Sequence, residues 1–325
     1  MIFCRLSILR KILFKLLALS CVFLNGCAST PQTDALYDLN YAARYPATEL
    51  TETVFYPQQQ YQCGPAALAT VLDDSGVKVT PEELTPLIYI PDKKGSLQIE
   101  IIAATRRFGR IPYLIKPQLQ DLLAEIAAGK PVLVFQNLGL DWYSQWHFAV
   151  VIGYDLTKNE IILRSGEEKQ HRVTVALFER TWARADYWAL RILKPGEFPL
   201  NADELRYLTS LVSLERLNKW SELIIAYQAA AQKWPDNQNF KMGLANSYYS
   251  KQQLTLARKE YLHIIQLWPE YAPAFNNLAQ LNLDTRKLAM ALKYAKKAVS
   301  LGGVHHSIYQ KTLLEIQNKL EKKIE

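Results

Sequence analysis

The chain has 325 residues, enough for more than one domain, and its 38 Lys and Arg against 31 Asp and Glu give a net charge of +7. Four of the basic residues lie in the first 26 positions, which contain no acidic residue, so the remainder carries only +3. A charge this small, without a clustered basic face, argues against a protein specialised for nucleic-acid binding. Three of the four cysteines, Cys4, Cys21 and Cys27, lie within the first 27 residues, so Cys63 has too few cysteines nearby for a metal site. The sequence contains no motif for a metal or another cofactor, and none is predicted.

The N-terminal segment is basic, then apolar, then small, which is the pattern of an export signal. Its apolar run, residues 16–24, is shorter than the about 20 residues that span a bilayer. The run ends in Leu24-Asn25-Gly26-Cys27, which resembles the bacterial lipobox except at Asn25. The resemblance implies a signal peptide over residues 1–26 and lipid attachment at Cys27, and the Ala at position 28 implies the outer membrane, facing the periplasm. The alternative is a leader cut elsewhere, which leaves Cys27 as a free thiol.

The next part of the chain predicts a tether and then an α+β domain. Residues 27–50 are short of large aliphatic side chains and are predicted to form the tether, with the domain over residues 51–195. One helix is predicted from Cys63 to before Gly76, another from an N-cap at Ser96 to Gly109, and a third over residues 117–128. Stretches rich in β-branched and aromatic residues predict strands at 131–135, 147–153, 160–163 and 187–193. Helices that precede strands favour an α+β fold.

After Pro195 the chain is helical and repeats. Residues 196–204 are predicted to form a linker, since Pro195, Gly196 and Pro199 interrupt regular structure. The pair Trp234-Pro235 recurs 34 residues later as Trp268-Pro269, which is the period of the tetratricopeptide repeat. Small and aromatic residues fall where two such repeats and a weaker first one need them: Tyr227, Ala230, Ala245, Tyr248, Ala257, Tyr261, Phe275, Ala279, Ala291 and Ala298. We expect an all-α repeat domain over residues 205–325, with a polar capping helix over 304–325. The alternative is an ordinary helical bundle.

A cysteine and a histidine are the candidate catalytic residues. Two other cysteines lie in the leader and Cys27 lies at the lipidation position, so Cys63 remains as an unpaired thiol, which in an exported protein indicates reactivity. A helix start also favours the thiolate. A cysteine nucleophile needs a base, and His147 opens a predicted strand, whereas the other histidines lie in a charged stretch or in the repeats. The alternatives are a buried, inert cysteine and a histidine satisfied in the core.

Two segments resemble a known family. Gln58 followed by Cys63-Gly-Pro-Ala66, and the stretch His147-Phe-Ala-Val-Val-Ile-Gly-Tyr-Asp155, are similar to the papain-like family of bacteriocin-processing cysteine peptidases, which cut leader peptides after a double glycine. The resemblance covers residues 51–193. It implies a papain-like domain with Cys63 as nucleophile, His147 as base and an upstream glutamine as oxyanion donor. Gln58 has the family spacing, and Gln59, Gln60 and Gln62 are the alternatives. The transporter segments of those enzymes are absent, so a double-glycine substrate does not follow.

The third catalytic member departs from the family pattern, in which an Asp or Asn before a Pro lies on the strand after the histidine. Here that stretch reads Ile161-Ile-Leu-Arg-Ser-Gly166. Asp155 lies eight residues along a strand from His147, about 26 Å away. Folding the hairpin about residues 156–157 brings Arg164 to Gly166 beside His147 instead. Ser165 or a backbone carbonyl is therefore expected to orient the imidazole.

These patterns predict a membrane-anchored periplasmic cysteine peptidase that hydrolyses a peptide bond, with repeats that recruit a protein partner or substrate. Lys241, Asn246 and Asn276 lie near positions that face the groove of such repeats, beside Tyr248. The aromatic stretch from Trp142 to Trp146 either lines a cleft or packs structurally. Two other functions remain open: a decayed peptidase fold that acts as an adaptor through its repeats, and an acyl or amide transferase that uses the same Cys-His pair. The repeats could also be a stabilising appendage.

Overall fold

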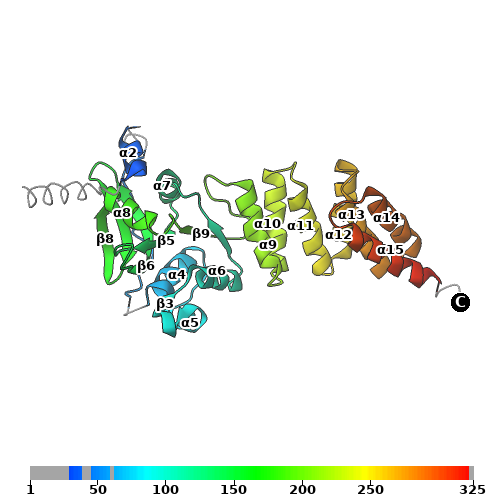
Figure 1. Ribbon diagram of the computed structural model, residues 1–325, viewed down its shortest axis with the longest axis horizontal. Coiled ribbons are helices and arrows are strands. Elements are labelled where there is room, and N and C mark those ends of the chain that lie inside the picture. The colour runs from blue at the N-terminus through cyan, green and yellow to red at the C-terminus, as the bar shows by residue number, and fades with distance from the viewer. Residues whose placement is uncertain (1–28, 39–44, 59–61, 322–325) are drawn as a thin grey trace, which may run out of the picture.

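The computed structural model describes residues 29–38, 45–58 and 62–321, and it has two parts along its long axis (Figure 1). A domain built around a β-sheet ends with β9, and the helices from α9 to α15 extend from it in a row. The predicted combination of an α+β domain with an all-α repeat domain is confirmed.

The main sheet is antiparallel, and its strands lie in the order β4-β9-β5-β6-β7-β8, with β1 paired to β6. Alternate side chains of β6 enter two different cores: Phe148, Val150 and Ile152 enter one, while Ala149 and Val151 enter the other. This follows from the two-residue period of a strand. The strands are β1 (Thr48–Glu49), β4 (Ile111–Leu114), β5 (Val132–Asn137), β6 (Trp146–Asp155), β7 (Glu160–Ser165), β8 (Glu168–Thr174) and β9 (Ala189–Leu193).

Helices cover both faces of the sheet. One core contains α4 (Cys63–Asp74), α5 (Pro81–Ile88) and α6 (Gln98–Arg107), and the other contains α2 (Pro31–Asp38), α7 (Leu119–Ala127) and α8 (Val175–Ala183). Between α5 and α6 lie a short 3₁₀ turn, η1 (Pro91–Lys93), and a two-stranded hairpin of β2 (Tyr89–Ile90) and β3 (Gly95–Ser96). Each large apolar side chain fully buried in these cores contributes about 1.5–3 kcal/mol.

Two expectations about local structure are wrong, and one strand was not predicted. The described part of the predicted tether packs on the domain: Leu36 is in the core, and the Glu179 carboxylate accepts hydrogen bonds from the backbone N–H groups of Gln32 and Thr33. Ser96 is not a helix N-cap, because it lies in β3 opposite Tyr89. The charged stretch around His171 is strand β8, whose polar side chains suit an edge strand.

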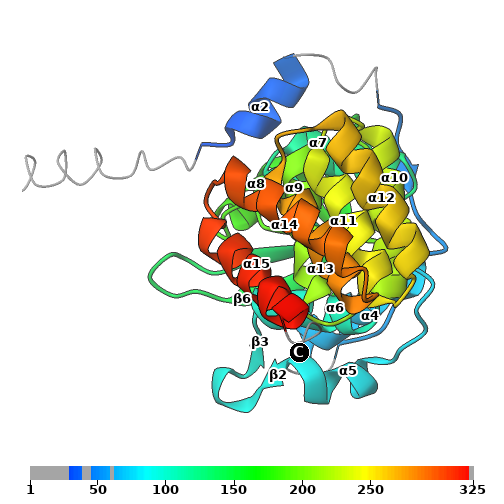
Figure 2. The same cartoon turned by 90° about the vertical axis from the view of Figure 1, so that its right-hand side faces the viewer.

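The repeat half consists of helices that stack on their sequence neighbours (Figure 2). They are α9 (Glu204–Glu215), α10 (Trp220–Lys233), α11 (Gln238–Ser250), α12 (Leu254–Leu267), α13 (Ala272–Asp284), α14 (Leu288–Leu301) and the terminal α15 (His306–Glu321). Small residues lie where helices approach: Ala245, Ala257, Ala279 and Ala291 are fully buried. Gly243 allows the closest approach, since a Cβ there would lie 2.4 Å from the Tyr227 ring. The predicted tetratricopeptide organisation is confirmed.

The two halves share a core at their junction. Tyr207 and Leu211 of α9 and Leu223 of α10 belong to the same cluster as Ile111 of β4 and Leu122 of α7. The segment between β9 and α9, expected as a linker over 196–204, is therefore fastened to the domain at both ends.

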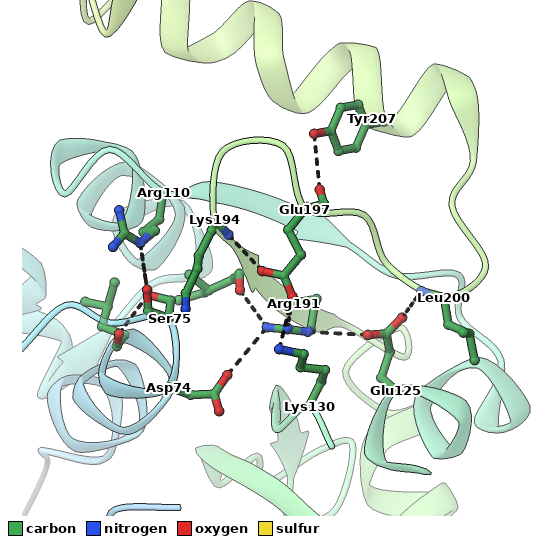
Figure 3. A network of polar contacts seen from close by, with 12 residues as sticks. Asp74, Ser75, Arg110, Glu125, Lys130, Arg191, Lys194, Glu197, Leu200 and Tyr207 are labelled. Carbon is green, nitrogen blue, oxygen red and sulfur yellow. Dashed lines mark hydrogen bonds and ion pairs between the residues drawn. The ribbon is translucent and has the colours of Figure 1, made fainter. Parts of the chain in front are cut away.

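A buried ion network fastens this connecting segment (Figure 3). Arg191 of β9 is 1% exposed and pairs with Glu125 at 3.3 Å and Glu197 at 2.8 Å. Glu125 accepts a hydrogen bond from the backbone N–H of Leu200 (2.6 Å), and Glu197 accepts one from that of Lys194 (3.0 Å). Burial raises the pKa of Glu125, whereas for Glu197 the Lys194 N–H and the Arg191 charge outweigh burial and lower the pKa. The Arg191 guanidinium thus binds both carboxylates that accept hydrogen bonds from the segment between β9 and α9.

Candidate active site

Cys63 and His147 line one cleft, whose volume is about 1010 Å³. The cleft lies where the N-terminus of α4 meets the start of β6, two elements that pack on each other. Gln58 lines it as well, together with Ser96, Leu97 and Trp146. The structure therefore brings three of the predicted site residues to one surface depression.

Cys63 is held at the first turn of α4 because the helix after it, from Gly64 to Leu72, is buried. Gly64 is needed beside the cysteine: a Cβ at this position would lie 2.4 Å from the Ser96 hydroxyl oxygen. The glycine lets β3 pack against the helix turn that contains Cys63 and so shapes the cleft. This contact links residues 32 positions apart and has no signature in the sequence.

The thiol of Cys63 is not acidic in this structure. Burial raises its pKa, and the backbone N–H groups of Phe148, Gly64 and Cys63 itself act in the opposite direction with less effect. Burial therefore acts against the thiolate that is expected at the helix start, because desolvation outweighs the helix terminus. The influence of the Phe148 amide shows that the sulfur lies against the start of β6.

His147 is held by the hairpin of β6 and β7. Its Nε2 lies 2.8 Å from the Ser165 hydroxyl oxygen, which is the contact expected from folding this hairpin. Burial, with a smaller contribution from His171, lowers the pKa of His147 to about 4. The imidazole is consequently neutral at pH 7. If Nε2–H donates to Ser165, Nδ1 retains a lone pair that can accept a proton.

No hydrogen bond joins the Cys63 thiol and the His147 ring within the described part of the chain. The predicted hydrogen-bonded pair is therefore not formed in this structure, although both side chains line the same cleft. Catalytic contacts of cysteine and serine enzymes are often long without substrate and tighten in the complex.

Two residues at the end of β7 and the glycine after it make contacts that organise the site. Arg164 is 2% exposed and donates hydrogen bonds to the backbone carbonyls of Thr51 (3.1 Å), Thr53 (2.8 Å) and Lys169. Ser165 contacts His147, and the carbonyl of Gly166 accepts a hydrogen bond from the backbone N–H of Gln58 at 3.0 Å. Sequence reasoning missed the role of Arg164, whose carbonyl partners lie in distant segments.

The other candidates lie elsewhere. Asp155 binds Thr157 and Lys158 at the far end of the β6–β7 hairpin, as expected from the strand length. Gln62 occupies the N-cap position of α4 without a side-chain cap bond. The leader over residues 1–26, Cys27, Gln59 and Gln60 lie outside the described residues. Within the described ranges, the side chains form no metal-binding cluster, and no helix is long and apolar enough to cross a membrane.

Comparisons with known proteins show which proteins the cleft-containing half of the chain is similar to. Residues 51–189 match the model of the Peptidase_C39 like family. An uncharacterized protein of Methanothermobacter thermautotrophicus is 33% identical over 104 residues, which are 32% of this chain and 66% of that protein, slightly less than two thirds of its length.

Solved structures resemble each half separately. One, described as a C39-like peptidase from Bacillus anthracis, is 18% identical, with a TM-score of 0.39 and coverage of 46% of this chain and 98% of that one. The Yersinia enterocolitica type III secretion chaperone SycD, in complex with a peptide of the translocator YopD, is 17% identical, with a TM-score of 0.33 and coverage of 35% and 92%. The match of residues 51–189 confirms that this part of the chain resembles the Peptidase_C39 like family, as its cysteine and histidine motifs predict.

Proposed function

We propose that the chain is a cysteine peptidase that hydrolyses a peptide bond in the cleft between α4 and β6. The observation that carries this proposal is the meeting of Cys63, a neutral His147 and Gln58 in one cleft. A raised thiol pKa beside a lowered imidazole pKa favours general-base activation, in which the proton leaves the sulfur as attack occurs.

The proposed reaction has two halves. Nδ1 of His147 takes the thiol proton while the sulfur of Cys63 attacks the substrate carbonyl carbon, and the resulting oxyanion is stabilised by the Gln58 amide and the backbone N–H of Cys63. The imidazolium then gives its proton to the departing amine, which leaves a thioester on Cys63. Water, deprotonated by His147, hydrolyses the thioester and regenerates the thiol. Ser165 keeps the ring in place through both halves.

Variants of the paired residues test the proposal. A mixture of peptides of known sequence, incubated with the chain, is expected to be cleaved, as detected by mass spectrometry. Cys63→Ala is expected to abolish cleavage, and His147→Ala to slow it about 10²–10⁴-fold, the range for loss of a general base. His263→Ala, at an exposed position of α12, is the matched control and should retain cleavage. Equal cleavage by parent and Cys63→Ala would contradict the proposal.

The runner-up function is an adaptor that binds polypeptides without cutting them. The observation that favours it is the hydroxyl of Ser165 where the family has a carboxylate or amide, because a hydroxyl stabilises an imidazolium less. Under this alternative no variant at position 63 changes any covalent bond in the peptide mixture, while binding persists.

We also propose lipid attachment at Cys27, at the outer membrane facing the periplasm, on the strength of the Leu24-Asn-Gly-Cys27 pattern. Cys27→Ala should leave the leader uncut or release the protein from the membrane fraction, and normal processing would contradict this part.

The repeats are proposed to bind a protein partner or the substrate. In the structure Asn246 accepts hydrogen bonds from Tyr261 (2.7 Å) and Asn277 (2.9 Å), and Asn276 is largely buried. These two amides therefore support the helix packing, and Lys241 is the better candidate for contact with a partner. Lys241→Glu should weaken partner capture without changing the reactivity of Cys63. Unchanged capture of the partner would exclude this lysine from the binding face.

A further inference from the structure

The hairpin between β5 and β6 presents large apolar side chains to solvent at the edge of the cleft. We call residues 138–146 the aromatic hairpin; it projects from the domain (Figure 2). Trp142 at its tip is 82% exposed and Tyr143 is 64% exposed. Leu138, Leu140 and Trp146 are each about half exposed. Monomeric proteins seldom expose so many large apolar groups together unless they bind something there.

The aromatic hairpin is built to hold its shape. Asn137 is 2% exposed, and its side-chain oxygen accepts hydrogen bonds from the backbone N–H groups of Gly139 (3.0 Å) and Gln145 (2.9 Å). Arg184 donates to the carbonyl of Gly139 at 2.8 Å. At the tip, Leu140 and Tyr143 exchange two backbone hydrogen bonds of 3.0 Å. The backbone that carries the exposed rings is therefore held by hydrogen bonds, which lowers the conformational entropy lost on binding.

The aromatic hairpin is continuous with the cleft. Ser144, Gln145 and Trp146 line the cleft that contains Cys63 and His147, and the Trp146 ring stacks on Phe135 with centroids 5.1 Å apart. Leu97, also partly exposed, lines the same cleft. A chain that lies in this cleft would therefore meet large apolar side chains as well as the nucleophile.

Charge distinguishes two possible occupants. The aromatic hairpin contains Asp141 and no Lys or Arg. Segments that bind anionic bilayer surfaces place several basic residues beside their aromatic groups. Here Arg184, which contacts the hairpin, is paired with Asp141 at 3.9 Å and donates to the Gly139 carbonyl, and the hairpin is continuous with the cleft, so these contacts favour a polypeptide. We propose that the aromatic hairpin is a substrate-selecting wall that binds a large aromatic or aliphatic side chain of a polypeptide near the bond that lies at Cys63. This inference rests on the proposed function, in that the same cleft receives the polypeptide.

The test measures binding separately from cleavage. The full chain carrying Cys63→Ala is immobilised and exposed to a tryptic digest of purified soluble proteins, and the retained peptides are identified by mass spectrometry. Peptides with Phe, Trp, Tyr or Leu should be enriched. Adding Trp142→Ser and Tyr143→Ser should weaken their retention about tenfold or more, the usual effect of removing an aromatic anchor. The matched control replaces two equally exposed apolar residues of the repeat half, Leu205→Ser and Val304→Ser, and should retain the same peptides as Cys63→Ala alone.

The remaining outcomes of this test separate the selecting role of the hairpin from the proposed hydrolysis. Retention without apolar enrichment, or unchanged by the hairpin substitutions, overturns the selecting role. A blue shift of Trp142 fluorescence with vesicles of phosphatidylethanolamine and phosphatidylglycerol, without retention of peptides, assigns the hairpin to a membrane and overturns it as well. Hairpin-dependent retention together with no cleavage by the parent chain supports the selecting role and contradicts only the proposed hydrolysis.

Discussion

Each half of the chain is stabilised internally by contacts of a different range in the sequence. Around the cleft, Gln58, Cys63, Ser96, His147 and Gly166 come from separate segments, and each is positioned by another segment far away in the sequence. In the repeat half, helices pack mainly on the helix before and the helix after. A disturbance in the first half should therefore reach the site from many positions, whereas one in the repeats should stay local.

The change from long-range contacts to packing between neighbouring helices does not occur at the predicted linker, residues 196–204. Residues of α9 and α10 share the core of the sheet domain, and α11 contributes both to that core, through Phe240, and to the next, through Ala245. The first helix pair is thus part of the cysteine-containing half in physical terms. This supports the stabilising role of those two helices and leaves α11 to α15 as the independent repeat surface.

The largest expected effect is at Arg191. Arg191→Met leaves Glu125 and Glu197 without their shared cation, and breaking a buried ion cluster in this way costs about 3–5 kcal/mol. The loss should be greatest at neutral pH and smaller in acid, where Glu125, left without its cation, becomes protonated, whereas Glu197 keeps its pair with Lys130 at 3.3 Å. Urea unfolding at pH 7 and pH 5, followed by tryptophan fluorescence, measures both.

Lys319→Met, which breaks an exposed pair with Glu315, is the control for Arg191→Met and should change the urea midpoint little. Because the two halves share a core, we expect Arg191→Met to lower the unfolding midpoint of the sheet domain together with α9 and α10. Separate transitions for those helices and for the sheet would show that the junction is weaker than its contacts indicate.

A smaller and local effect is expected at Gly243. Gly243→Ala places a methyl group against the Tyr227 ring, and overpacking of this kind costs about 1–3 kcal/mol despite the better helix propensity of Ala. Differential scanning calorimetry should show the loss, while the rate at which iodoacetamide alkylates Cys63 stays unchanged. Ser250→Ala, on an exposed position of the same helix, is the control. A parallel change in the Cys63 alkylation rate would mean that the repeats are coupled to the cleft.

The sequence predicted residue positions more fully in the repeats than around the cleft, because contacts in the repeats are local in the sequence. The repeats are periodic, so Ala245, Ala257 and Tyr261 could be placed from spacing alone. The motifs around Cys63 and His147 predicted that these two residues meet at one site, and strand arithmetic located Ser165. Arg164 could not be found, because its carbonyl partners at Thr51 and Thr53 become neighbours only after the sheet forms.

The described part of the tether was misjudged for a related reason. Its helix, α2, has few apolar residues of its own, and it is held by Leu36 in the core and by a carboxylate, Glu179, that lies 146 positions away from Thr33. No local pattern announces a contact of that range. The same limit applies to Ser96, whose place beside Gly64 depends on how β3 folds over α4.

The smallest expected effect is a change in the alkylation rate of Cys63, and it tests the protonation states of Cys63 and His147. In the parent chain both the thiol and the imidazole should be neutral at pH 6, because burial raises the pKa of Cys63 and lowers that of His147 to about 4. Iodoacetamide should then alkylate Cys63 more slowly at pH 6 than it alkylates a free cysteine, whose pKa is about 8.5. Alkylation as fast as that of free cysteine would contradict the neutral pair.

Ser165→Asp supplies the charge that the family pattern has and this chain lacks. A carboxylate beside Nε2 raises the pKa of His147, so the imidazolium persists to higher pH, and its positive charge lowers the pKa of the Cys63 thiol. At pH 6 the alkylation rate should rise about tenfold for each unit by which the thiol pKa falls. Ser165→Asn has the same shape and can still accept from Nε2–H but carries no charge, so it should leave the rate near that of the parent. Equal rates for the two variants would show that position 165 sets the orientation of His147 and not its charge, and the cleft would then depend on general-base activation alone.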